Sequence, residues 1–389
     1  NKIPTKKSGF NPNWQIKTLN EVCNKISAGG DKPDDCTTEK TEENQIPIFS
    51  NGIKNKGLCG YTKTPAITKP ALTISARGTI GFACVRYEPF FPIVRLICVI
   101  PNEKLVILEF LCYALQYIIP QGEGTSVPQL TIPNFKKIKI PIPPLDEQKR
   151  IASALSKIDA YLENTIKLIE EKERFKRGIA KKLLTCKEGE NIPEARFKGF
   201  EDEWEIFKLG DMFDNFKEKN NEDKIILAST IDKGVIPNSL TERKIIRKKE
   251  SLSNYKLVKK GCFVISLMSF QSGFEYSDYE GIISPAYSVL KPKIEMAHYF
   301  YKYYFKSFKF IKDLLPYAEG IRHGKQIKFK ACKDILVPYP SIEEQEKIGG
   351  YLSLLDEEID NLKKQKELIK EMKRGAMQKL LSGEVRLLE

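Results

Sequence analysis

An internal repeat constrains this chain more than any other feature of its sequence. When residues 144–186 are aligned without a gap on residues 341–383, at an offset of 197 residues, 15 of the 43 positions are identical. A Trp-x-Ile-x-x-Leu motif also occurs twice, beginning at Trp14 and at Trp204. The segments between, roughly 20–130 and 210–327, hardly resemble each other. Matched frames around dissimilar centres indicate one scaffold that presents two different surfaces.

The repeated frame segments are predicted to be long helices. Each follows a proline-rich turn and carries two acidic residues in its first turn, where the positive end of the helix dipole favours them. In the second segment apolar residues recur at alternating steps of four and three from Ile348 to Ile369, interrupted by Lys366. A helix of about 40 residues is roughly 60 Å long. Because neither apolar stripe is stable in water alone, we expect the two helices to pack on each other.

The two dissimilar segments are typical of mixed α/β domains. Residues 71–75, 92–100 and 262–266 are predicted strands, because β-branched residues are frequent and glycine-bearing turns follow two of them. Residues 103–118 and 297–314 are predicted helices. The fold class is therefore α+β: two mixed α/β domains, two long helices and a pseudo-twofold repeat. The boundaries that we expect are 1–143 and 187–340 for the domains, the second with its linker, and 144–186 and 341–389 for the helices.

Charge and cysteine content narrow the functional class. The net charge is +13 and the isoelectric point is about 9.1, which favours a polyanionic partner but also fits a generally lysine-rich protein. Nine cysteines without a CxxC pair, and only two histidines, speak against a disulfide scaffold and a zinc site. No apolar run reaches about 18 residues and no signal peptide is visible. We expect a cytoplasmic protein without a membrane segment, metal or cofactor.

Motifs for catalysis are absent from the sequence. It has no GxxxxGK[ST] phosphate loop, and the segment 320–326 has the wrong spacing and ends in glutamine. Asn11-Pro12-Asn13-Trp14 only imitates the motif with which amino-methyltransferases hold their target amine, because it lacks the second proline. No glycine-rich loop follows an early strand, as a nucleotide site would require. We therefore expect a chain that is not itself an enzyme.

The doubled frame resembles the specificity subunit of type I restriction–modification enzymes. The resemblance depends on Pro-Ile-Pro-Pro-Leu-Asp-Glu-Gln at 141–148 and Pro-Tyr-Pro-Ser-Ile-Glu-Glu-Gln at 338–345, each followed by a long helix ending in Lys-Arg-Gly-x-x-x-Lys-Leu-Leu. The segment 265–275 and Ile283-Ser-Pro-Ala-Tyr287 are also similar to that family. The likeness covers both repeats and thus the whole chain.

The resemblance implies a division of labour. Each variable domain would be a target recognition domain that reads one half of a bipartite sequence in double-stranded DNA. The two helices would form an antiparallel coiled coil that spaces these domains and docks modification subunits, two in number, which carry the adenine methylation. Restriction subunits would join them in the cleaving complex. Two alternatives remain: a stand-alone DNA methyltransferase or nuclease accessory, and a coiled-coil interaction protein whose basic charge is incidental.

Candidate DNA contacts are cationic, amide or hydroxyl side chains in polar loops of the two domains. Arginine suits guanine edges, glutamine suits adenine, and lysine suits phosphate. For each, a solvated surface turn is the alternative. The candidates in the first domain are Lys54, Lys56, Lys63, Arg77, Thr79, Ser126 and Gln129. Those in the second domain are Arg243, Lys244, Arg247, Lys248, Ser269, Gln271, Arg322, His323 and Lys325.

Candidate partner and coiled-coil residues lie on the two repeated helices. The polar set could face a partner subunit or only cap the helix starts. The apolar set is expected in the helix seam. The polar candidates are Glu147, Gln148, Glu344 and Gln345, and the apolar ones are Ile151, Leu155, Leu162, Ile348, Leu352 and Ile359.

Overall fold

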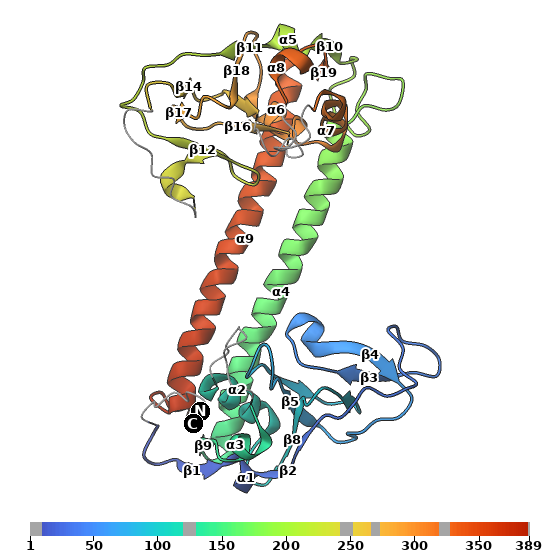
Figure 1. Cartoon of the computed structure of the whole chain (residues 1–389), viewed down its shortest axis with the longest axis vertical. Helices are drawn as coiled ribbons and strands as arrows, with labels where there is room; N and C mark the ends of the chain where they lie inside the picture. The colour runs from blue at the N-terminus through green and yellow to red at the C-terminus, as the bar shows by residue number, and fades with distance from the viewer. Residues whose placement is uncertain (1–9, 120–129, 242–251, 266–272, 319–326, 388–389) are drawn as a thin grey trace. The chain divides into compact units, whose positions relative to one another are not determined.

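The computed structural model describes residues 10–119, 130–241, 252–265, 273–318 and 327–387 (Figure 1). The chain forms two compact units, one of residues 1–166 and 364–389 and the other of residues 167–363. Each unit holds one α/β domain, the beginning of the helix that follows this domain and the end of the other long helix. The four expected segments therefore differ from these units, because each long helix contributes its two halves to different units.

In the first unit, an antiparallel pair of strands, β1 and β9, brings the start and the end of the domain together. A four-stranded sheet has the order β2-β8-β5-β6, and a three-stranded sheet has the order β4-β3-β7. The strands are β1 (Gln15–Thr18), β2 (Cys23–Ala28), β3 (Ile46–Phe49), β4 (Leu58–Thr62), β5 (Ala71–Ile74), β6 (Ala83–Arg86), β7 (Phe91–Pro92), β8 (Ile97–Pro101) and β9 (Lys139–Ile142). The helices of the domain are α1 (Leu19–Val22), α2 (Leu108–Ile118) and α3 (Ile132–Lys136), with the 3₁₀ turn η1 (Lys54–Gly57).

The core of the first unit lies where α2 packs on the four-stranded sheet, against β6 and β5. Apolar residues of α2 such as Phe110 and Leu111 are fully buried there, beside Leu72 of β5. The start of α4 (Leu145–Leu184) and the end of α9 (Ile342–Ser382) complete this core. A long helix thus begins as part of its own domain.

The second unit repeats this plan with a different sequence. Strands β10 and β19 pair as β1 and β9 do, and the four-stranded sheet β11-β18-β15-β16 corresponds to β2-β8-β5-β6. Two-stranded sheets β12-β13 and β14-β17 are added. The strands are β10 (Glu205–Lys208), β11 (Phe213–Phe216), β12 (Leu227–Thr230), β13 (Gly234–Pro237), β14 (Lys256–Val258), β15 (Phe263–Ile265), β16 (Phe274–Tyr276), β17 (Gly281–Ile283), β18 (Ser288–Pro292) and β19 (Leu336–Tyr339). The helices are α5 (Leu209–Met212), α6 (His298–Tyr304), α7 (Phe308–Leu314) and α8 (Phe329–Cys332), with 3₁₀ turns η2 (Asn238–Leu240) and η5 (Leu315–Tyr317).

Aromatic rings fill the core of the second unit. Phe305 lies 5.1 Å from Phe263, 5.0 Å from Phe274 and 4.7 Å from Phe310, measured between ring centroids. Each of these four side chains is fully buried. Edge-on and tilted aromatic pairs at this spacing stabilise a core beyond the area that they bury.

The α+β fold with two α/β domains, two long helices and an internal repeat is confirmed, with corrections inside the domains. The predicted strand 92–100 is interrupted at residues 93–96, between β7 and β8. The predicted helix 297–314 is two helices, because Ser307 caps α7 by accepting a hydrogen bond from the Phe310 amide. The predicted helix 103–118 begins only at Leu108.

Candidate DNA interface and helix frame

Arg77 and Thr79 lie in the tight turn between β5 and β6. The turn is closed by two hydrogen bonds, from the Ser75 amide to Phe82 O at 2.9 Å and from the Gly81 amide to Ser75 O at 3.0 Å. Arg77 is exposed at its tip, and Thr79 is half-buried. The turn therefore presents an arginine at the end of a buried strand, where the sequence predicts a polar loop, and its contact with DNA stays a prediction.

Lys54 and Lys56 lie in the loop between β3 and β4, and both are exposed. The Ser50 amide donates to Gly57 O at 2.8 Å and closes this loop. The guanidinium of Arg86 stacks on Phe49, 3.5 Å from the ring centroid, and donates to the carbonyl oxygen of Lys56. The loop that carries the two lysines is thus fixed to the sheet.

Lys63, a third predicted phosphate contact, is engaged with carboxylates of its own chain. Its ammonium lies 2.5 Å from Glu43, and its amide donates to Asp35 at 3.1 Å. The hydrogen bond with Glu43 raises the pKa of Lys63. The geometry favours an intrachain role for this lysine, and its contact with phosphate stays a prediction.

The other predicted DNA contacts lie outside the described residues. These are Ser126, Gln129, Arg243, Lys244, Arg247, Lys248, Ser269, Gln271, Arg322, His323 and Lys325. The segment 266–272 joins β15 and β16, as the Arg77 turn joins β5 and β6. At its far end the buried Glu275 accepts a hydrogen bond from Lys306 at 2.6 Å, and Lys306 also donates to Ile231 O at 2.7 Å.

The glutamines at the two helix starts hold each helix to its domain. Gln148 accepts a hydrogen bond from the Ile107 amide at 2.9 Å and donates to Leu105 O at 3.0 Å and Pro143 O at 2.9 Å. Gln345 accepts from the Ala297 amide at 2.9 Å and donates to Pro340 O at 2.8 Å. In both domains the glutamine thus ties the residue that precedes α2 or α6 to the long helix. This tie accounts for the repeated glutamine in the sequence.

In the second unit, Glu344 is held by two donors from the linker that follows α4. Arg196 donates to both carboxylate oxygens, each at 2.8 Å, and the Trp204 indole donates to Oε2 at 2.9 Å. Only 1% of Glu344 is exposed. Burying a charged carboxylate without hydrogen-bond partners costs free energy, and the arginine and the indole compensate this cost for Glu344. We call these three residues the glutamate clasp.

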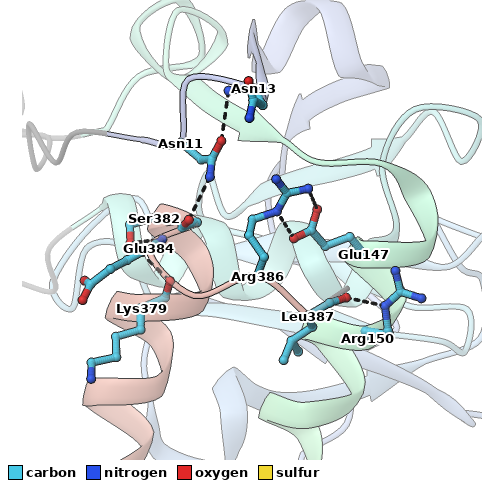
Figure 2. Close-up of polar contacts among 10 residues, drawn as sticks. Asn11, Asn13, Glu147, Arg150, Lys379, Ser382, Glu384, Arg386 and Leu387 are labelled. Atoms are coloured by element: carbon cyan, nitrogen blue, oxygen red, sulfur yellow. Dashed lines mark hydrogen bonds and ion pairs between the residues drawn. The ribbon is translucent and has the colours of Figure 1, made fainter. Parts of the chain in front are cut away.

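In the first unit, Glu147 is held by Arg386 from the segment that follows α9. Arg386 donates to the two carboxylate oxygens at 2.5 and 2.7 Å (Figure 2). Leu387 O accepts from Arg150 at 2.5 Å, and Asn11 donates to Gly383 O at 2.9 Å. The segment after α9 therefore bonds both to the chain before β1 and to the start of α4.

These contacts correct the expectation for the polar residues at the helix starts. Each of the four side chains Glu147, Gln148, Glu344 and Gln345 is at most 1% exposed and bonded inside its own unit. They offer no surface for a partner subunit. The partners Arg386 and Arg196 were missed because they lie 239 and 148 residues from their glutamates.

A tyrosine, an aspartate and a lysine connect the domain to both helices in the first unit. Asp159 of α4 accepts from Tyr113 of α2 at 2.8 Å and lies 2.5 Å from the Lys373 ammonium of α9. Burial raises the pKa of Tyr113, with the hydrogen bond to Asp159 as the second cause, so the phenol stays a donor.

The same arrangement recurs in the second unit. Asp356 of α9 accepts from Tyr303 at 2.7 Å and from Lys176 of α4. The lysine and aspartate of both triads are identities of the repeat, so the sequence contained this signal, whereas the tyrosines lie outside the aligned segments. Ion pairs between the helices continue with Lys172–Glu358 and Glu173–Lys363, both at 2.7 Å.

Four of the apolar helix candidates are buried where both long helices pack into the domain cores. Ile151 and Leu155 are fully buried in the core of the first unit, with Leu380 and Leu381 of α9. Ile348 and Leu352 are fully buried in the core of the second unit. Ile359 is buried and Leu162 is half-buried.

Over the described residues, no three His, Cys, Asp or Glu side chains are grouped so that they could hold a metal ion. Within the same residues, the helices lack the length and apolar character needed to cross a membrane.

The repeated frame has a counterpart among known families. The sequence profile of the type I restriction modification DNA specificity domain matches residues 11–171 and again residues 201–371. The chain belongs to the type I restriction–modification specificity family. It carries two copies of this domain. Its relatives bear the names of specificity subunits, not of catalytic ones, in agreement with the expectation that the chain is no enzyme.

Two relatives illustrate how far the similarity extends. A putative type I specificity subunit of Mycoplasma pneumoniae is 37% identical over 153 residues, which are 38% of this chain and 45% of that protein. A putative type I restriction enzyme specificity subunit of Methanocaldococcus jannaschii is 27% identical over 310 residues, which are 74% of this chain and 70% of that protein. The matched part thus spans less than half of the Mycoplasma pneumoniae relative.

Two solved structures share the fold. The crystal structure of a type I restriction–modification S subunit from M. genitalium superposes with a TM-score of 0.61 at 19% identity, over 97% of this chain and 99% of that one. A chain from a study of assembly and conformational transition of a type I restriction–modification system has a TM-score of 0.53 at 16% identity, over 98% and 100% of the two chains.

Proposed function

We propose that this specificity subunit binds double-stranded DNA and that each of its two recognition domains reads one half of a bipartite target. The observation that carries the proposal is the family domain matched twice, with one frame and two dissimilar middles. The net charge of +13 suits a polyanionic duplex. Exposed Lys54, Lys56 and Arg77 stand on loops that their own domain holds in place. Such a subunit acts where DNA is found, which agrees with the expected cytoplasmic location.

The two long helices, in this proposal, dock two modification subunits and set the gap between the half-sites. Apolar side chains stand exposed on the helix surfaces in both units, and Phe175 and Met372 occupy equivalent positions of the repeat. Phe175 is 52% and Met372 50% exposed. Two equivalent apolar positions suit two copies of the same partner. Restriction subunits join the assembly through the modification subunits in the cleaving form.

Methylation sequencing tests this proposal. The chain is expressed with its modification subunit in a host that lacks adenine methylation, and N6-methyladenine is mapped across the genome. A two-part motif with a fixed gap is expected only when the chain is present. A modification subunit that methylates the same sites without the chain would favour the alternative of an accessory to a stand-alone methyltransferase.

The coiled-coil alternative makes a different prediction about salt. A protein that neutralises about five phosphates loses affinity with a slope near −4 to −5 in log K against log salt. A flat response would favour an interaction protein with incidental charge.

A further inference from the structure

The turn between β7 and β8 holds two consecutive residues in the left-handed region of the backbone. Val94 has φ +54° and Arg95 has φ +59°, and both are exposed. A β-branched residue such as valine is a conformational outlier there. Strained residues of this kind persist only where their surroundings hold them, and they cluster at functional sites. The turn is held by its amides, from Val94 to Gly30 O at 2.8 Å and from Arg95 to Gly29 O at 3.0 Å.

The side chain of Asn51 joins this turn to the Arg77 turn. Its Nδ2 donates to Val94 O at 2.7 Å, and its Oδ1 accepts from the Ala76 amide at 2.7 Å. A third contact runs beside it, from the Gly52 amide to the Ser75 hydroxyl at 3.2 Å. One amide thus connects backbone groups that lie 25 and 43 residues away in sequence.

Asn51 itself begins the loop that carries the two exposed lysines. This loop also contains a left-handed pair, Asn55 at φ +49° and Lys56 at φ +52°. Three loops, residues 50–57, 75–82 and 93–96, are therefore joined by hydrogen bonds between side chains and backbone groups. Together they carry Lys54, Lys56, Arg77 and Arg95 and no acidic residue. Four cations on loops that are fixed before binding suit a duplex, because its regularly spaced phosphates bind well to cations that are already in place.

We propose that Arg95 contacts the DNA duplex, and that Asn51 is the positioning residue that holds the Arg95 turn beside the Arg77 turn. This inference rests on the proposed function, because it adds a contact and its support to the DNA surface of the first recognition domain. Arg95 escaped the sequence analysis because residues 92–100 were expected to form one continuous strand.

The test compares Arg95→Asn with Lys104→Asn in the full chain bound to its modification subunits. Asparagine is tolerated in the left-handed region, so Arg95→Asn removes the charge and keeps the turn. Lys104 is an exposed cation beyond the other end of β8, on the order of 20 Å away at about 3.3 Å per residue. Each complex selects duplexes from a pool with a randomised 40-base-pair centre, and the affinity for the wild-type consensus is measured at several salt concentrations.

Arg95→Asn is expected to weaken binding at least fivefold, while Lys104→Asn stays within twofold of wild type. A phosphate contact lowers the magnitude of the salt slope by about 0.9 and leaves the selected motif unchanged. A base contact removes the preference at one position of one half-site. Wild-type affinity, slope and motif in Arg95→Asn would overturn the inference.

The positioning role is tested by Asn51→Ala and Asn51→Asp. Both are expected to weaken binding, and Asn51→Ala should add little once Arg95→Asn is present. Any loss of base preference should be confined to one half-site, which a general loss of structure would not produce. Asn51→Asp keeps the acceptor for the Ala76 amide and loses the donor to Val94 O. It tests the positioning role if Asn51→Ala does not fold. Wild-type affinity in Asn51→Asp, or equal loss of base preference in both half-sites, would contradict the role.

Failure of the inference and failure of the proposed function give different results. If the wild-type complex selects no motif, the proposed function is wrong. If wild type selects a bipartite motif and Arg95→Asn selects it with equal affinity, only the role of Arg95 is wrong.

Discussion

Replacing Arg196 by methionine is expected to destabilise the second unit by about 3–5 kcal/mol, because it leaves a buried carboxylate with one neutral donor. Glu344 loses both bonds to the guanidinium, each at 2.8 Å, and keeps only the Trp204 indole at 2.9 Å. With a urea m-value of about 1–3 kcal/mol/M, the unfolding midpoint should fall by at least about 1 M.

The assay uses tryptophan fluorescence, since the chain has two tryptophans, one in each unit. In a Trp14→Phe background, Trp204 alone reports on the second unit, where it is 2% exposed and packs on Phe300. Arg174→Met, at an exposed position of the same unit, is the matched control. It should change the free energy of unfolding by no more than about 0.5 kcal/mol.

A double variant separates the charge pair from simple loss of packing. Glu344→Gln together with Arg196→Met removes the buried charge and leaves an acceptor for the indole. It should be more stable than Arg196→Met alone, with a coupling of about 0.5–3 kcal/mol. If Arg196→Met unfolds at the same urea concentration as Arg174→Met, the reasoning about the glutamate clasp is refuted.

Three further predictions concern the helices and the cysteines. Deleting four residues, about one turn, from both long helices at equivalent positions should shorten the gap in the methylated motif by about 6 Å, nearly two base pairs. An unchanged gap would contradict the proposal that the helices set the gap between the half-sites. Phe175→Glu and Met372→Glu should each remove one modification subunit from the complex, measured as mass by light scattering, and an intact complex with both changes present would contradict docking at these positions. Burial raises the pKa of the Cys98, Cys112 and Cys332 thiols to about 12, so they should react with a thiol reagent at pH 8 at least tenfold more slowly in the folded chain than in urea; equal rates, measured by mass spectrometry of labelled peptides, would show that these sites are open.

The frame of the fold was predictable because its signals are local or repeated. Helix starts, acidic first turns and apolar spacing predicted α4 and α9, and their bounds, 145–184 and 342–382, lie within the expected segments. The break between β7 and β8 was not predictable, because Val94 favours strands by propensity and is held in a left-handed turn by Asn51 and Gly30. That geometry comes from residues far away in the sequence.

The roles of the helix-start residues show the same limit. Periodicity and charge marked Glu147 and Glu344 as special but left open whether a partner or the chain itself would engage them. Their arginines lie in segments that the repeat does not align, and only the folded chain brings them together. The loops with Lys54, Lys56 and Arg77 were recognisable as polar turns after strands, whereas their connection through Asn51 was not.

The proposal that this chain reads a bipartite DNA target is tested most directly by mapping N6-methyladenine in a methylation-free host that expresses the chain with its modification subunit. The account predicts a motif of two specified halves around a fixed unspecified gap, absent when the chain is omitted. A soluble complex that methylates no motif, or a motif without a gap, would contradict it.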